Sequence, residues 1–268
     1  MKTKHIRLGV QGLFFLIIGG ISLNHNITGS GVSLHGICPF GGVVTFYNYI
    51  TAGSFIKKIH YSSILIMYLI LGLSVLMGPV FCGWVCPLGS IQEWFGKIGS
   101  RIFAKKYNHF VPTKIDRILR YLRIIILILV VYMTIQSAQL LFQNVDPYFA
   151  LFNFWTGEVA ITAIIVLLIT LVGSLFIERP WCKYLCPYGA FLGFFNKIRI
   201  FKIRRNSKTC INCHQCDESC PMNLEIEKNE KVTSLQCISC LKCTSNQACP
   251  VENTVELKVR GEKNEINS

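Results

Sequence analysis

The residues of this chain that could do chemistry are above all its 13 cysteines, eight of which lie after residue 209. Residues 210–221 read CINCHQCDESCP, which spaces four cysteines as C-x2-C-x2-C-x3-C-P. Residues 237–250 read CISCLKCTSNQACP, the same pattern with two more residues before the last cysteine. The first spacing is typical of bacterial ferredoxin domains that hold two clusters. The tail is therefore predicted to bind two [4Fe–4S] clusters.

In paired runs of this kind, the fourth cysteine of each run ligates the cluster of the other run. The predicted ligands of one cluster are Cys210, Cys213, Cys216 and Cys249. Those of the other cluster are Cys237, Cys240, Cys243 and Cys220. A zinc ribbon also uses paired C-x2-C, but triple cysteine runs that end in Cys-Pro are not typical of it. Apolar stretches at 200–203 and 255–259 could pair as strands and close a small ferredoxin-like domain over residues 200–260, with a polar end at 261–268.

A second cysteine pattern occurs twice, as FCGWVCPLGSIQEWFGKI at 81–98 and as WCKYLCPYGAFLGFFNKI at 181–198. The cysteine pairs are Cys82 with Cys86 and Cys182 with Cys186. Residues four apart lie on one face of a helix, so each phrase is expected to present a thiol pair. Four thiols make a full ligand set for iron or an iron–sulfur centre. A dithiol/disulfide couple and simple packing of buried cysteines are the competing interpretations.

The thirteenth cysteine, Cys38, lies in a glycine-rich and aromatic stretch three residues after His35. This pair could bind a metal or contact a quinone on the outer face of a membrane. A loop that simply covers helix ends is an equally good interpretation of the stretch.

Long apolar runs must position these cysteines. The mean hydropathy is +0.45, and only 15% of the residues are charged, against about 25% in soluble domains. Four runs stand out, at 8–23, 61–81, 124–142 and 159–177. About 20 apolar residues cross a bilayer, and the first run lacks a small-residue cleavage site. The predicted fold is an α-helical membrane domain over residues 1–199, with four transmembrane helices in two duplicated pairs, followed by the ferredoxin-like domain.

The basic residues predict the orientation of this domain. Eight Lys and Arg lie in residues 97–123 and eight in residues 179–208, whereas the alternate loops carry only Lys57 and Lys58. Cytoplasmic loops are the basic ones, so both termini are expected in the cytoplasm. The cytoplasm is a reducing compartment, so metal binding or redox chemistry is a better explanation of the cysteines than structural disulfides. Basic charge beside span ends meets anionic lipid headgroups, so the net charge of +13 does not indicate a nucleic-acid partner.

The two C-x3-C-P phrases and the paired ferredoxin runs, in this order along one chain, resemble the polyferredoxin membrane family that includes NapH, NosR and CcoG. The size and the four spans look most like the NapH-type membrane ferredoxins. The resemblance implies a protein of the prokaryotic inner or plasma membrane that passes electrons between the quinone pool, or a cytoplasmic donor, and a partner reductase or electron-carrier subunit. The alternative is a maturation factor that handles copper or iron through the C-x3-C-P cysteines, much as CcoG-type relatives act on copper.

Overall fold

The computed structural model describes residues 2–28, 61–137, 141–154 and 159–259. Most of these residues are helical, and the tail adds one two-stranded sheet. The longer helices are α1 (Lys2–Thr28), α3 (Tyr61–Met77), α4 (Pro87–Phe103), α5 (Thr113–Ser137) and α7 (Ile161–Ser174). Shorter helices are α6 (Pro147–Asn153), α8 (Pro187–Gly193), α9 (Phe195–Ile198) and α10 (Gln215–Glu218).

Helix length bears directly on the four predicted spans. Within the described ranges, one segment, His5–Asn24 in α1, is long and apolar enough to cross a bilayer. The apolar segments Leu65–Met77 and Ile161–Ser174 are shorter; the latter, 14 residues long, rises only about 21 Å, less than the roughly 30 Å of a hydrocarbon core. Five charged side chains occupy the first half of α5 (Lys114, Asp116, Arg117, Arg120 and Arg123). The helix lengths therefore support one span directly, and the four-span arrangement stays a prediction.

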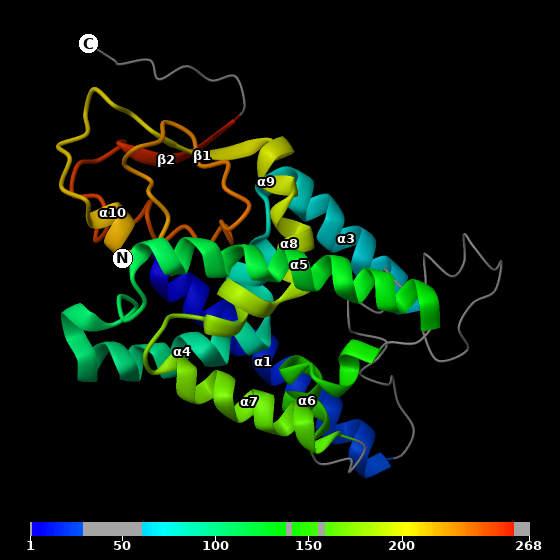
Figure 1. The fold of residues 1–268 in the computed structure, drawn as a ribbon. Helices are drawn as coiled ribbons and strands as arrows, with labels where there is room; N and C mark the ends of the chain where they lie inside the picture. Colours follow the sequence, from blue (N-terminus) through cyan, green and yellow to red (C-terminus); the bar gives the residue numbers. More distant parts are fainter. Residues whose placement is uncertain (1, 29–60, 138–140, 155–158, 260–268) are drawn as a thin grey trace.

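The helices pack around α4. This helix contacts both α1 and α7, and α6 lies against α7, α1 and α4. On the other side, α5 contacts α8 and the helical turn that precedes it. Figure 1 shows the tail on one side of α5 and α4, α6 and α7 on the other. Proline stands at the first turn of α4, α6 and α8, where its fixed φ favours helix initiation.

The tail forms a small sheet and a set of loops. Strand β1 (Phe201–Arg205) pairs antiparallel with β2 (Val255–Val259), with Ile203 opposite Leu257. The pairing predicted for these two stretches is thus present, and β1 extends two residues beyond the predicted end. Ile203 is buried, so the sheet contributes to the core that surrounds the tail cysteines.

Side-chain hydrogen bonds fasten the tail to the helices. The indole Nε1 of Trp84 donates to the Ser239 carbonyl at 3.1 Å. The Asn196 amide donates to the Cys237 carbonyl at 2.8 Å, and Arg199 donates to the Ser239 hydroxyl at 2.8 Å. All three bonds reach the segment that carries the second cysteine run. This run is therefore a main part of the docking surface of the tail, to which Asn223 adds hydrogen bonds with Asn108.

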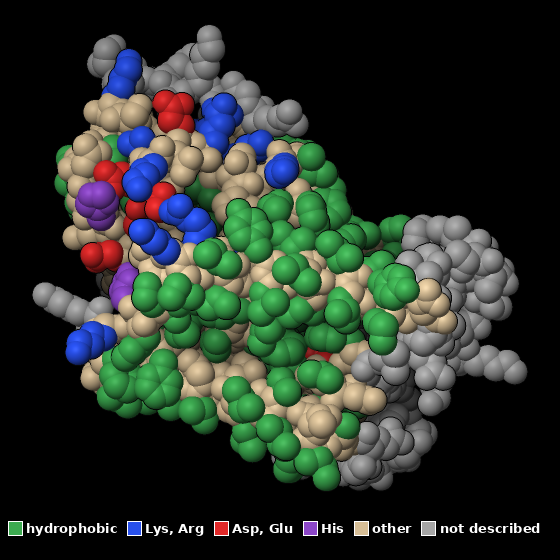
Figure 2. Space-filling view, viewed as in Figure 1, with side chains coloured by type: hydrophobic (Ala, Val, Ile, Leu, Met, Phe, Trp, Pro, Cys, Tyr) green, Lys and Arg blue, Asp and Glu red, His purple; other side chains and the backbone are tan. Residues whose placement is uncertain are grey.

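The surface divides into an apolar and a charged part. Figure 2 shows hydrophobic side chains covering α5 and α7, while most of the visible charged side chains gather over the tail. Exposed apolar residues include Ile118 on α5, Ile161 on α7 and Leu16 on α1, each at least 70% exposed. Such a surface is costly in water, so it favours a lipid or protein environment around the helices.

Candidate iron–sulfur centres and the doubled cysteine phrase

Among the residues that line the first tail cavity are Cys210, Cys213, Cys216 and Cys249. The structure therefore brings together the four cysteines that the spacing groups as ligands of one cluster. The two additional residues before Cys249 are taken up by a turn in which the backbone N–H groups of Ala248 and Cys249 both donate to the Ser245 carbonyl.

Among the residues that line the second tail cavity are Cys220, Cys237, Cys240 and Cys243. These are the four cysteines predicted to hold the other cluster. The cavity is closed by apolar side chains, among them Ile203, Met222 and Ile226, each at most 2% exposed. Burial raises the pKa of Cys220 to about 12. Since a cluster is held by thiolates, binding it would require Cys220 to lose the proton that burial favours in the absence of a cluster.

The backbone of the two runs is alike. Asn212 and His214 have φ of 54° and 59°, and Ser239 and Leu241, at the same places in the second run, have φ of 51° and 55°. A leucine in the left-handed region costs roughly 1–2 kcal/mol, so Leu241 is strained. Residues of this conformation turn successive backbone N–H groups into a concavity that suits anionic iron–sulfur clusters. The donor set and the backbone of both loops fit [4Fe–4S] clusters.

The repeated cysteine pattern at 81–98 and 181–198, called the doubled phrase below, has the same local structure in both copies. Phe81–Val85 and Trp181–Leu185 are π-helical turns. The Cys86 N–H donates to the Phe81 carbonyl at 2.8 Å, and the Cys186 N–H to the Trp181 carbonyl at 2.9 Å. The second cysteine of each copy then leaves the helix and caps the next one. The expectation of two thiols on one face of a continuous helix was wrong, because the wider turn and the following proline interrupt the helix.

The four thiols of the doubled phrase lie close enough to influence one another. The Cys82 pKa is raised by burial and by the charges that Cys86 and Cys182 would carry. Burial, followed by Cys182, likewise raises the pKa of Cys86 to about 12 and that of Cys186 well above its ordinary value. Four thiolates in one buried site would repel one another, so their charge must be neutralised by a bound cation or by protonation.

Polar groups reach this thiol cluster from several helices. Gln92 on α4 contacts the Cys182 sulfur at 3.5 Å, and the Gly189 N–H points to the Cys186 sulfur at 3.3 Å. Arg179 donates to the Cys82 carbonyl at 2.6 Å, and Arg123 donates to the Cys182 carbonyl at 3.4 Å. The two guanidinium groups place positive charge beside the thiols, which favours thiolate ligands.

Glu93 is the centre of a buried charge network that the cysteine patterns did not reveal. Its carboxylate pairs with Arg7, with Arg179 at 2.7 Å and with Lys242 at 3.4 Å. Burial alone would raise its pKa, but Arg179, Lys242 and Arg7 together hold that pKa well below the ordinary value. Arg7 also donates to the Cys240 carbonyl at 3.2 Å, so the network joins α1, α4 and the second tail run.

A signal for this network is present in the comparison of the two copies. Glu93 in the first copy corresponds to Gly193 in the second, and Gly83 corresponds to Lys183. Lys183 is fully buried and pairs with Asp116 of α5 at 2.8 Å. At both of these positions, the charged residue of one copy makes a long-range ion pair.

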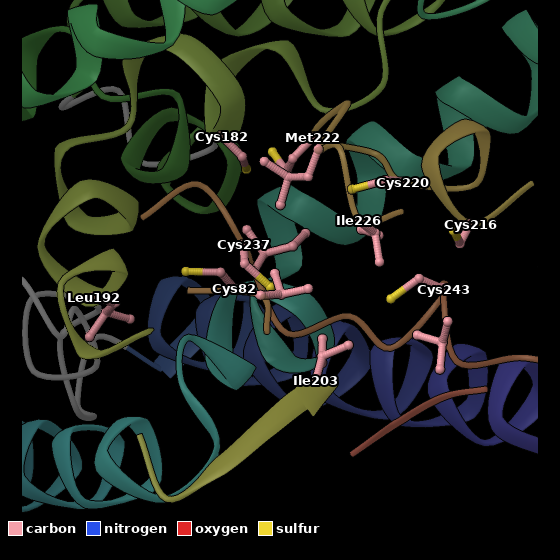
Figure 3. Close-up of a cluster of buried hydrophobic side chains, with 14 of the residues drawn as sticks. Cys82, Cys182, Leu192, Ile203, Cys216, Cys220, Met222, Ile226, Cys237 and Cys243 are labelled. Atoms are coloured by element: carbon pink, nitrogen blue, oxygen red, sulfur yellow. The ribbon is translucent and has the colours of Figure 1, made fainter. Parts of the chain in front are cut away.

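The thiol cluster and the second tail cavity share one core. Cys82 and Cys182 belong to the same buried cluster as Cys220, Cys237 and Cys243, as Figure 3 shows. Cys216 of the first tail cavity also belongs to it. Cysteines from all three groups therefore take part in one continuous packed interior. His35 and Cys38, the candidate outer-face site, lie outside the described residues.

Comparison with known proteins gives the same class of protein. Residues 59–106 and 159–207 match the family described as a 4Fe-4S binding domain (Fer4_5), and each matched segment contains one copy of the doubled phrase. The putative electron transport protein YccM of Escherichia coli is 28% identical over 233 residues, covering 85% of this chain and 64% of YccM. The uncharacterized protein MJ0750 of Methanocaldococcus jannaschii is 32% identical over 210 residues, covering 78% of this chain and 82% of MJ0750.

The ferredoxin-type protein NapH of Haemophilus influenzae is 34% identical over 184 residues, covering 65% of this chain and 61% of NapH. No solved structure matches the chain. The fold and the cysteine sites thus define an iron–sulfur protein of ferredoxin type. The chain belongs to the NapH/NosR-type ferredoxin family.

Proposed function

We propose that this chain is a membrane-bound iron–sulfur protein that passes electrons between the quinone pool, or a cytoplasmic donor, and a partner reductase or electron-carrier subunit. The observation that carries the proposal is the continuous core that holds cysteines from all three groups. The names of two relatives, an electron transport protein and a ferredoxin-type protein, support the same function.

Two [4Fe–4S] clusters are proposed in the tail, one for each cavity. When bound, they supply one-electron transfer. Cys210, Cys213, Cys216 and Cys249 would hold one of them, and Cys220, Cys237, Cys240 and Cys243 the other. The chain contributes left-handed loops, whose backbone N–H groups face the cluster site, and an apolar shell that excludes water. Both would tune the reduction potential of a bound cluster.

A further iron or iron–sulfur centre is proposed at Cys82, Cys86, Cys182 and Cys186. Burial keeps these thiols protonated in the absence of a cation, and a metal ion is the strongest means of deprotonating them. Gln92 and the Gly189 N–H would donate hydrogen bonds to the sulfurs. A reversible dithiol/disulfide couple is the other chemistry that four clustered thiols allow.

The membrane placement proposed here has four spans, with both termini in the cytoplasm. The apolar exposed surfaces of α1, α3, α5 and α7 support it, as does the gathering of basic residues after α4 and α7. The tail would then lie in the reducing compartment, where iron–sulfur clusters persist.

The alternative function is a maturation factor that exchanges copper or iron through the C-x3-C-P cysteines. A metal-exchange site needs an accessible thiol pair. Cys82 and Cys182 are each 8% exposed, and they lie in the core beneath the docked tail. This burial favours a resident centre over an exchange site.

The test compares Cys82→Ala, Cys182→Ala and the double variant in the full chain, purified without oxygen. Groups that act as a unit are strongly non-additive, so all three variants should lose reduction of the tail clusters by menadiol to a similar depth. Dithionite should still reduce those clusters, which shows that the tail has folded. Wild-type rates with menadiol in the double variant would refute a redox role for the doubled phrase.

A further inference from the structure

A cavity of about 70 Å³ borders the thiol cluster. Three of its lining residues are Cys86, Cys182 and Cys186. The remaining lining residues come from the segments 81–88, 142–148 and 181–188. The segment between α5 and α7, which the sequence assigns to an outer loop, therefore reaches the doubled phrase.

Aromatic rings form a large part of the walls of this cavity. Phe142 and Trp181 lie with ring centroids 6.2 Å apart and planes inclined by 31°. Phe81 and Tyr188 meet edge to face at 5.9 Å. Tyr148 completes the aromatic lining. Walls of this kind suit a flat ring that can stack on one neighbour and meet the edge of another.

Asp146 is the one carboxylate among the described residues that line the cavity. Its Oδ1 atom accepts the Tyr148 N–H at 3.0 Å and so caps α6. The described residues offer no hydrogen bond to Oδ2. An aspartate in an apolar pocket is costly to ionise, and burial raises the Asp146 pKa to about 7. The role of Asp146 as the cap of α6 does not by itself explain why a cavity lies beside its carboxylate.

We propose, resting on the function proposed above, that this cavity binds the ring of a quinone or hydroquinone and that Asp146 makes a hydrogen bond to a ring oxygen. The ligand is a flat apolar ring with a polar oxygen at each end. Aromatic walls with a single convergent polar group match it. The three thiols on the cavity wall would set the bound ring directly beside the proposed redox site of the doubled phrase.

The test is a binding titration on the full chain, with its iron–sulfur clusters in place and in detergent. The probe is the fluorescent quinone analogue 2-heptyl-4-hydroxyquinoline N-oxide, whose emission is quenched on binding. Asp146→Asn removes the charge but keeps a residue that caps a helix well, so α6 should stay folded. Glu225→Gln is the matched control, because it makes the same change at a carboxylate of the tail that does not line the cavity.

The wild type and Glu225→Gln should bind the probe with the same affinity at one site per chain, and menadione should compete for it. Asp146→Asn should bind at least about tenfold more weakly, as expected on losing a hydrogen bond to a charged group. Unchanged probe affinity in Asp146→Asn would overturn the proposal. Competition by n-decanol as effective as that by menadione would also overturn it, since the cavity would then be a site for an acyl chain.

The rate of cluster reduction by menadiol separates this proposal from the proposed function. If wild type is reduced by menadiol but Asp146→Asn binds the probe and reacts with menadiol like wild type, the quinone site lies elsewhere and the electron-transfer function stands. If wild type binds the probe in an Asp146-dependent manner but menadiol reduces no cluster, the site stands and the function proposed above fails.

Discussion

Gly83 lies directly against Cys240. A methyl group on Gly83 would stand 3.1 Å from the Cys240 Cα atom and 2.5 Å from the Ile238 carbonyl oxygen. The first copy of the doubled phrase thus contacts the backbone of the second tail run without any side chain between them. In the second copy, Gly193 approaches the Leu235 carbonyl in the same way. Each copy therefore contributes one glycine to the surface on which the tail docks.

Gly83→Ala should weaken the docking of the tail. The atoms that the new methyl group would meet belong to backbone, so the cysteine loop itself must shift, and overpacking of this kind costs typically about 1–3 kcal/mol. The expected results are a lower apparent melting temperature and slower reduction of the tail clusters by menadiol. Gly72→Ala in α3 is the control, because a methyl group there meets nothing within 4 Å. Equal behaviour of the two variants would contradict the close contact.

Glu93→Gln should be strongly destabilising. The variant leaves Arg179 and Arg7 without the carboxylate that neutralises them, whereas Lys242 keeps its pair with Glu178. Removal of one partner from a buried pair costs roughly 3–5 kcal/mol. Thermal unfolding measures the loss. Glu225→Gln breaks an exposed pair with Arg117 and should change stability by less than about 1 kcal/mol. A change in Glu93→Gln as small as in this control would show that the network contributes little.

Cys249→Ser should remove the cluster held with Cys210, Cys213 and Cys216, and leave the other cluster intact. Iron should fall from about eight atoms per chain in the tail to about four. Adding Cys213→Ser should remove no further iron, because both residues line the same cavity. Adding Cys240→Ser should remove the remaining cluster. Iron content and electron paramagnetic resonance after anaerobic purification measure both results, and the opposite pattern would reverse the ligand grouping.

Stability should depend on pH through Asp146. Burial raises the pKa of Asp146 to about 7 in the folded chain, against about 3.9 when unfolded, so the folded state holds a proton that the unfolded state has lost. This contribution to stability decreases as the pH rises from about 4 to about 7 and is constant above that range.

Relative to Asp146→Asn, the wild type should therefore lose about 2 kcal/mol between pH 5.5 and pH 7.5. The measurement is the apparent melting temperature of both proteins across this range at one scan rate. A difference between them that does not change with pH would show that the folded-state pKa of Asp146 is not raised in the way expected from its burial.

Membrane topology can be tested with reporters fused at three truncation points. Fusions after residues 110 and 268 should be active only as cytoplasmic reporters, and a fusion after residue 155 only as an external one. The reason is the concentration of Lys and Arg in residues 97–123 and 179–208, which cytoplasmic loops favour. An external signal from the fusion after residue 268 would place the tail on the oxidising side and refute the proposed orientation.

The sequence by itself determined the features that depend on short spacing. Three cysteines spaced by two residues each must lie on one loop, and the two runs of the tail adopt the same left-handed backbone at Asn212 and Ser239. The strands at 201–205 and 255–259 follow from short apolar stretches that flank these runs. The duplication was also visible, because residues 81–98 and 181–198 repeat the same cysteine, proline and glycine positions in register.

The tertiary structure alone decided how these parts meet. Nothing in the spacing of Glu93 indicates that Arg7, Arg179 and Lys242 converge on it, since the four residues come from segments far apart in the chain. Nothing in the sequence around Asp146 indicates that it lies near the cysteines, yet the packing of α6 against α4 and α7 brings it to the cavity beside the thiol cluster. Each local pattern is compatible with many contact partners, and only the long-range packing determines which residues meet. That packing brings the doubled phrase into contact with the tail.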